Sequence, residues 1–205
     1  MIIMKKIVCA LLALICCLSF ASCGDNGLTE SMTSIKDGSL TPTLKGNYYI
    51  NYLDSESTEY VAARVGDDMF FWNNLDTVMH YYHKASDGWD EYTKNAQNSD
   101  EYGTKPVNHY NTADEIVKKS LSALLSTDGI ENKDKSPKLE EYNGLACLKY
   151  TDGDNYTYIS TDYNIIVESC RNDGKKNQVV FGLYRDMKTD DYTKFDDSMI
   201  PKQFK

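Results

Sequence analysis

Short segments in which apolar and polar residues alternate recur along most of the chain, a pattern typical of half-buried β-strands. The first half holds four such segments, at 47–53, 59–65, 68–72 and 77–83. The second half holds four more, at 145–151, 156–161, 164–171 and 178–185. Turn-forming residues such as Gly66-Asp67 stand between them. The pattern therefore predicts an antiparallel sheet.

The register of the second group follows from its turn lengths, because neighbouring strands show their apolar side chains on one face. We assign a three-residue loop to 152–154 and a two-residue turn to Asp162-Tyr163. This register predicts one apolar face made of Leu148, Tyr150, Tyr156, Tyr158, Ile165 and Val167. The other face is mostly polar and carries both Cys147 and Cys170.

One helix is predicted between the two groups of strands. Thr112-Ala-Asp-Glu115 is a capping box, in which the threonine hydroxyl and the glutamate carboxylate satisfy backbone N–H groups at the start of a helix. Gly129 suits its end. An apolar stripe follows the cap and consists of Ile116, Val117, Leu121, Leu124 and Leu125. We expect this stripe to pack on the sheet.

The segment from Ser86 to Tyr110 is polar and contains two glycines and a proline, which favours a long excursion over the surface. It also holds Trp89 and Tyr92. These two rings form either a binding loop or a local packing cluster, and we favour the packing cluster.

The first 22 residues have the layout of a secretory signal peptide. Two lysines precede Ile7–Phe20, a stretch of fourteen residues without a charge. As a helix this stretch is about 21 Å long, short of the roughly 30 Å of a bilayer core. The small residues Ala21 and Ser22 complete the pattern of a cleavage site.

Phe20-Ala21-Ser22-Cys23 resembles the lipobox of bacterial lipoproteins, whose cysteine is diacylated and becomes the mature N-terminus. The family more often has leucine at the place of Phe20. The resemblance implies a lipoprotein held on the extracytoplasmic face of the cell membrane by a diacylglyceryl group on Cys23, since two acyl chains such as palmitate give stable anchoring. The alternative is an ordinary secreted protein without this lipid.

Composition sets the domain limits and excludes one class of partner. After removal of residues 1–22, 20 basic and 31 acidic side chains remain, a net charge of −11, and the lysines are scattered. Nucleic acid is therefore not an expected partner.

Residues 23–45 are mostly small and polar and predict a flexible tether. A single domain at 46–205 follows it.

No pattern in the chain predicts an enzyme, a cofactor or a metal site. His80 and His83 point to opposite sides if they lie in a strand, and we favour surface histidines. Asp152-Gly-Asp-Asn155 resembles the start of a calcium loop, but it lacks the later Gly and Glu and is better interpreted as a hairpin turn. The acidic residues at 186–191 and 196–197 are interpreted as a solvated rim.

The two cysteines left for a disulfide are Cys147 and Cys170. In the predicted register they lie two strands apart, about 10 Å, whereas the Cα atoms of a disulfide lie within about 7 Å of each other. We predict no bridge. The opposing expectation is that two cysteines remaining in an exported chain form a pair.

Taken together, the elements resemble the LolA/LppX-like lipoprotein superfamily. The resemblance rests on four features: the strands from Asn47, the capped helix, the segment Tyr142–Tyr150 that enters a meander, and the C-terminal stretch from Tyr192 to Phe204. It implies an α+β fold, in which a strongly curved antiparallel sheet forms a half-open barrel covered by one or more helices. In that family the concave cavity holds acyl chains.

The resemblance implies a candidate ligand cavity. Its wall would be the predicted apolar face of Leu148, Tyr150, Tyr156, Tyr158, Ile165 and Val167, and its lid would carry Ile116, Leu121 and Leu124. The first hypothesis is accordingly a membrane-anchored lipoprotein that binds a lipid or another apolar ligand. The alternative is a structural or protein-interaction lipoprotein with a solid core, for an unspecified protein partner. An enzyme comes third.

Overall fold

The computed structural model describes residues 35, 38–54, 56–75, 77–97, 101–128, 130, 135–171 and 199–205 with their side chains, and the backbone of 175–185. The first strands are β1 (Tyr48–Leu53), β2 (Glu59–Val65), β3 (Asp68–Asn73), β4 (Val78–Lys84), β5 (Trp89–Asn95) and β6 (Asn108–Tyr110). The later strands are β7 (Lys138–Tyr142), β8 (Leu145–Asp152), β9 (Asn155–Ser160), β10 (Ile166–Arg171) and β11 (Lys175–Arg185). The helices are α3 (Ala113–Ser120), α4 (Ser122–Leu125) and the 3-10 helix η3 (Lys202–Phe204).

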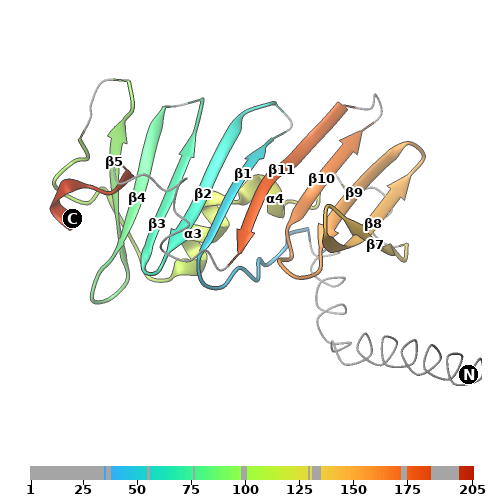
Figure 1. Ribbon diagram of the computed structural model, residues 1–205, viewed down its shortest axis with the longest axis horizontal. Coiled ribbons are helices and arrows are strands. Elements are labelled where there is room, and N and C mark those ends of the chain that lie inside the picture. The colour runs from blue at the N-terminus through green and yellow to red at the C-terminus, as the bar shows by residue number, and fades with distance from the viewer. Residues whose placement is uncertain are drawn as a thin grey trace, which may run out of the picture.

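The eleven strands of the described residues form one antiparallel sheet in the order β6-β5-β4-β3-β2-β1-β11-β10-β9-β8-β7. Two meanders meet at its centre, where the first strand pairs with the last: Tyr48 lies opposite Arg185. β6 and β7 form the edges, so the sheet is not a closed barrel (Figure 1). The fold is rich in antiparallel strands and has few helices in the part that the structure describes.

All eight predicted strands are confirmed, with ends that differ by at most three residues. The predicted surface excursion from Ser86 to Tyr110 is wrong, because β5 and β6 lie within it and extend the sheet. β7 was not predicted either. The burial pattern of β5 explains the error at 86–110. The charged residue Glu91 is buried in this strand, so its sequence does not show the alternation of apolar and polar residues that predicts a strand.

The turn between β8 and β9 is one residue shorter than predicted. Asp152 pairs with Asn155, so only Gly153 and Asp154 lie in the turn. Gly153 has φ 58°, as the first central position of a type II′ turn requires. Because side chains alternate between faces, a shift of one residue reverses every side chain of β9 relative to β8. The predicted single apolar face is therefore wrong for the β9 tyrosines, Tyr156 and Tyr158.

The connection from β9 to β10 is longer than the predicted two-residue turn at Asp162-Tyr163. Residues 161–165 form it, and the N–H of Ser160 donates to the carbonyl of Ile165. Ile165 packs on the same side as Leu148, whereas Val167 packs on the other side with Tyr158. The predicted apolar set is thus divided between the two faces of the sheet.

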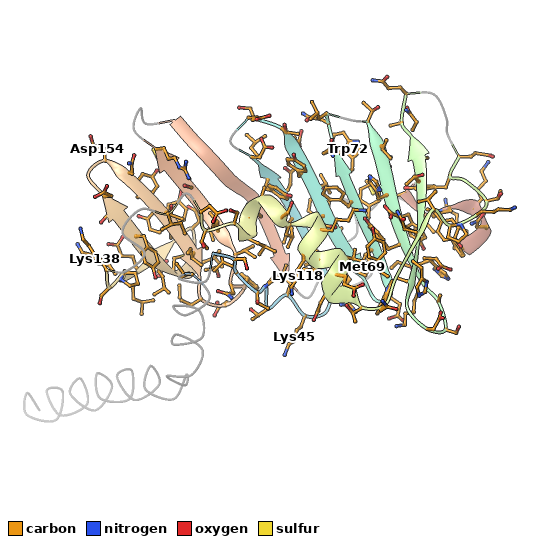
Figure 2. The ribbon with its side chains drawn as sticks, turned by 180° about the vertical axis from the view of Figure 1, so that it is seen from behind. Lys45, Met69, Trp72, Lys118, Lys138 and Asp154 are labelled. Atoms are coloured by element: carbon orange, nitrogen blue, oxygen red, sulfur yellow. The ribbon has the colours of Figure 1, made fainter. Side chains whose placement is uncertain are left out.

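The predicted capped helix is confirmed as α3 and α4, which break at Leu121 and cover one face of the sheet (Figure 2). We call this the helix face and the opposite one the outer face. The Thr112 hydroxyl accepts the Glu115 N–H at 3.3 Å, and the Glu115 carboxylate accepts the Asn111 N–H. The Tyr52 hydroxyl donates to the Ser120 carbonyl at 2.8 Å and ties the helix to β1.

Residues within the predicted tether are part of the packed domain. Ile35 is fully buried and Leu40 is 2 % exposed, both in the core of the helix face. The Leu40 N–H donates to the Leu125 carbonyl, and the Thr43 N–H donates to the Tyr163 carbonyl. The folded unit therefore begins before the predicted boundary at residue 46. Residues 1–34, which include Cys23, lie outside the described residues.

Candidate functional site

Six of the nine predicted cavity residues meet in the core of the helix face. None of them is more than 4 % exposed: Leu148, Tyr150 and Ile165 from the sheet side and Ile116, Leu121 and Leu124 from the helices. A side chain that lines a cavity wide enough for an acyl chain keeps accessible surface toward that cavity. These residues therefore pack against one another and line no such space.

The other three predicted residues lie on the outer face near the β7 edge. Val167 and Tyr158 are buried there with Cys147, and Tyr156 packs against them. The ring of Tyr142 stacks on that of Tyr158 with centroids 4.2 Å apart. This small core is separate from the one beneath the helices, so the nine residues do not form one site.

Glu168, which is 3 % exposed, organises the polar part of this outer cluster. Its carboxylate accepts hydrogen bonds from the hydroxyls of Tyr142 and Tyr156, the latter at 2.6 Å. Tyr142 reaches it from β7, across β8 and β9. The tyrosines close the outer face at this end of the sheet and leave Cys147 fully buried.

Cys147 and Cys170, the two cysteines among the described residues, are free and buried. Cys147 lies opposite Ser160, and Cys170 lies opposite Tyr156, so β9 stands between them and they are also displaced along it. Burial, with a smaller contribution from the charge of Asp162, raises the pKa of the Cys147 thiol to about 11. Cys147 is therefore a protonated, unreactive thiol at neutral pH.

Glu91 is the centre of a second buried polar cluster, at the opposite end of the helix face. One carboxylate oxygen lies 2.6 Å from Nδ1 of His80, and the other accepts from the Asn108 amide at 2.6 Å and from the Tyr110 hydroxyl at 3.0 Å. Lys119 of α3 donates to the first oxygen at 3.2 Å and to the Tyr110 hydroxyl at 2.7 Å. We call these five residues the Glu91 network.

The Glu91 network holds its charges in fixed states. Burial acts to raise the pKa of Glu91, but the hydrogen bonds from His80 and Asn108, the charge of Lys119 and the Tyr110 hydroxyl together hold it at about 2. Burial acts to lower the pKa of Lys119, and the bonds to Tyr110 and Glu91 raise it instead. Since the carboxylate is ionised, Nδ1 of His80 carries the shared proton.

The chemistry of this network favours a structural role. A general acid or base works best with a pKa near the operating pH, whereas the carboxylate and ammonium here have pKa values moved away from neutrality. The five residues come from β4, β5, β6 and α3. The network therefore fastens the helix and the short edge strand β6 to the sheet.

His80 and His83 lie in β4 and point to opposite faces, as predicted for a strand. His80 belongs to the Glu91 network and has a side chain only 17 % exposed, so the interpretation as a surface residue is wrong for it. On the outer face, Nδ1 of His83 lies 3.1 Å from Asp68, which also accepts from the Tyr81 hydroxyl at 2.8 Å.

Trp89 and Tyr92 are both buried, which agrees with packing rather than with a binding loop. They lie on different faces: Trp89 joins the core of the helix face, and Tyr92 joins an outer cluster with Tyr81 and Tyr102. Asp152-Gly-Asp-Asn155 forms a hairpin turn, as predicted. The acidic residues at 186–191 and 196–197 lie outside the described residues.

An open hollow of about 390 Å³ lies beside the outer cluster, where the end of the chain meets the loop before β6. Its lining comes from the two segments, with Glu101, Tyr102 and Thr104 on one side and Ile200, Pro201, Lys202, Gln203 and Lys205 on the other. The sequence contained no signal for it, because the two segments are far apart along the chain.

Comparison with known families found no family model that matches the chain, and searches of curated proteins and of solved structures found no match either. Within the described ranges, no helix has both the length and the apolar character needed to cross a membrane.

Proposed function

We propose that this chain is a lipoprotein, anchored through Cys23 on the extracytoplasmic face of a cell membrane, that acts by binding another protein. The signal-peptide layout and the lipobox at Phe20–Cys23 support the anchor. The sealed helix face is the observation that carries the choice of protein over lipid as ligand. Leu121, Leu124 and Ile165, which would line an acyl cavity, have no exposed surface.

Two features of the domain suit a binding scaffold. The sheet is long and is tied to its helices by buried polar contacts, so it presents side chains from a rigid frame. The folded unit already includes Leu40, so the polar stretch between Cys23 and the domain is shorter than the predicted tether. Under this proposal the sheet is held close to the bilayer.

The anchor is tested with a Cys23→Ser variant expressed beside the parent. We expect the parent in the membrane fraction, with a diacylglyceryl mass on its first residue, and the variant in the soluble or uncleaved fraction. Equal membrane association of both chains, without acyl mass on the parent, would contradict the anchor.

Lipid binding is the second candidate, and it rests on the resemblance to LolA/LppX-like carriers with their strongly curved half-open barrel. It would require the packed helix face to open around an acyl chain. Native mass spectrometry of the mature chain carrying Cys23→Ser separates the two candidates, since that variant has no lipid anchor of its own. We expect the mass of the bare chain, and a stoichiometric co-purified lipid would favour the carrier.

A further inference from the structure

The last residues of the chain occupy the outer face over β3, β4 and β5. The ring of Phe204 stacks on that of His83 with centroids 3.9 Å apart, and it lies 5.0 Å from Tyr92 and 5.8 Å from Tyr81. Ile200 packs against both neighbouring apolar clusters of this face. We call residues 199–205 the C-terminal segment, and the surface beneath it the outer groove.

Among the described residues, it is the side chains of this segment that contact the sheet and the loop before β6. Lys202 pairs with Glu101 at 2.6 Å, and the two side chains are 81 % and 66 % exposed. The N–H groups of Phe204 and Lys205 donate to carbonyls of the segment itself, at Pro201 and Lys202. The outer groove thus recognises an aliphatic, a cationic and an aromatic side chain at alternate positions of a seven-residue segment.

The C-terminal segment leaves the outer groove incompletely satisfied. The open hollow of about 390 Å³ lies beside it. The hydroxyl of Tyr102 and the indole N–H of Trp72 are buried at this surface and have no hydrogen-bond partner among the described residues. A buried donor without an acceptor costs free energy. An occupant of the groove that supplies the acceptor removes this cost. The groove therefore suits a segment with more acceptors than its own chain provides.

We propose that the outer groove binds a short segment of a partner protein with a 3-10 turn like that of Lys202–Phe204, and that the C-terminal segment is a stand-in that this partner displaces. The partner segment carries an aliphatic residue, a basic residue opposite Glu101 and an aromatic ring that stacks on His83. Its backbone carbonyls face Trp72 and Tyr102. This inference rests on the proposed function, because it names the surface and the partner chemistry of the same interaction protein.

A second copy of this chain is a poorer occupant. Its C-terminal segment offers the same side chains as the resident one, so exchange between copies leaves the same two donors unpaired. The basic position also argues for peptide rather than an apolar ligand, because Glu101 at the rim favours a cation.

The test measures binding of a fluorescein-labelled peptide with the sequence Met-Ile-Pro-Lys-Gln-Phe-Lys to the full mature chain by fluorescence anisotropy. Phe204→Ala withdraws the resident ring, so we expect this variant to bind the peptide about ten-fold or more tighter than the parent does. A peptide with alanine in place of phenylalanine should not bind. Leu139→Ala, at an exposed apolar residue on the far edge strand β7, should match the parent.

A charge exchange keeps the test informative if Phe204→Ala disturbs folding. Glu101→Lys removes the attraction for Lys202 and for the matching lysine of the peptide alike, so binding of the original peptide should stay nearly unchanged. A peptide with glutamate in place of its first lysine should bind this variant about two- to five-fold tighter than the original peptide does. Equal peptide binding by the parent and Phe204→Ala, no exchange of charge preference, or a parent dimer that Phe204→Ala abolishes would each overturn the partner groove. A co-purified lipid in native mass spectrometry would instead count against the proposed function.

Discussion

Replacing Glu91 by glutamine keeps the shape of the side chain and removes its charge. Four donors converge on the carboxylate from His80, Asn108, Tyr110 and Lys119. An amide offers one oxygen and turns an NH₂ group toward donors on its other side. We therefore expect Glu91→Gln to destabilise the domain by leaving at least one buried donor without an acceptor.

The magnitude follows from the pKa of Glu91. A pKa near 2 in the folded protein, against about 4.3 in an unfolded chain, corresponds to about 3 kcal/mol. Loss of one partner from a buried ion pair costs about 3–5 kcal/mol, and Lys119 is partly exposed, which places this case at the lower end. For a domain of this size the melting temperature should fall by about 6–12 °C.

The same carboxylate gives this difference a pH dependence of known sign. Its folded pKa is lowered, so its contribution is complete above the unfolded pKa and is lost as the pH falls from about 4.3 toward 2. The stability gap between the parent and Glu91→Gln should therefore be full at pH 7 and close toward pH 2.

Urea unfolding followed by the fluorescence of Trp72 and Trp89 measures both effects. Glu140→Gln is the matched control, because Glu140 is 37 % exposed and its pair with Lys149 should be worth less than about 1 kcal/mol. The reasoning is refuted if Glu91→Gln costs no more than this control at pH 7, or if its deficit is the same at pH 7 and pH 3.

Three further predictions concern packing and reactivity. Leu121→Ala removes a fully buried side chain between the helices and the sheet, so urea unfolding should show a loss of about 2–5 kcal/mol, and a loss below 1 would argue for a loose helix face. Gly88→Ala would bring a Cβ to 2.2 Å from the Tyr110 carbonyl, so β5 and β6 must separate at a cost of about 1–3 kcal/mol. Hydrogen exchange should show faster amides in both strands, and unchanged rates would contradict the close approach. Cys147, with a pKa of about 11, should react with a disulfide reagent only after unfolding, and rapid labelling of the native chain at this site would refute its burial.

Local patterns predicted much of the fold because their physical causes are local. The strand predicted at 47–53 is β1, in which Tyr48, Ile50 and Tyr52 are buried and alternate with half-buried neighbours. The capping box at Thr112 sets the start of α3 through hydrogen bonds between residues three or four apart. Such signals depend on a few adjacent residues, so a single sequence is sufficient to find them.

The errors arose where distant residues decide the outcome. Buried Glu91 looks like a surface residue until β4, β6 and α3 bring donors to it. Strand β7 contains Lys138, Glu140 and Glu141, and its pairing with β8 outweighs this polarity. Tyr156 and Tyr158 were placed on the wrong face because Asp152 belongs to β8 rather than to the loop, where it pairs with Asn155.

The seam between β1 and β11 has a consequence for how the chain folds. The pairing partners at this seam, such as Tyr48 and Arg185, stand near opposite ends of the domain in sequence. A chain that emerges N-terminus first can build the hairpins from β1 to β6 early, but β1 keeps one unpaired edge until its last partner arrives. Long-range pairing of this kind slows folding, and until it forms the unpaired edge of β1 is prone to aggregation. Truncation before β11 should therefore yield two half-sheets prone to aggregation rather than a smaller stable domain.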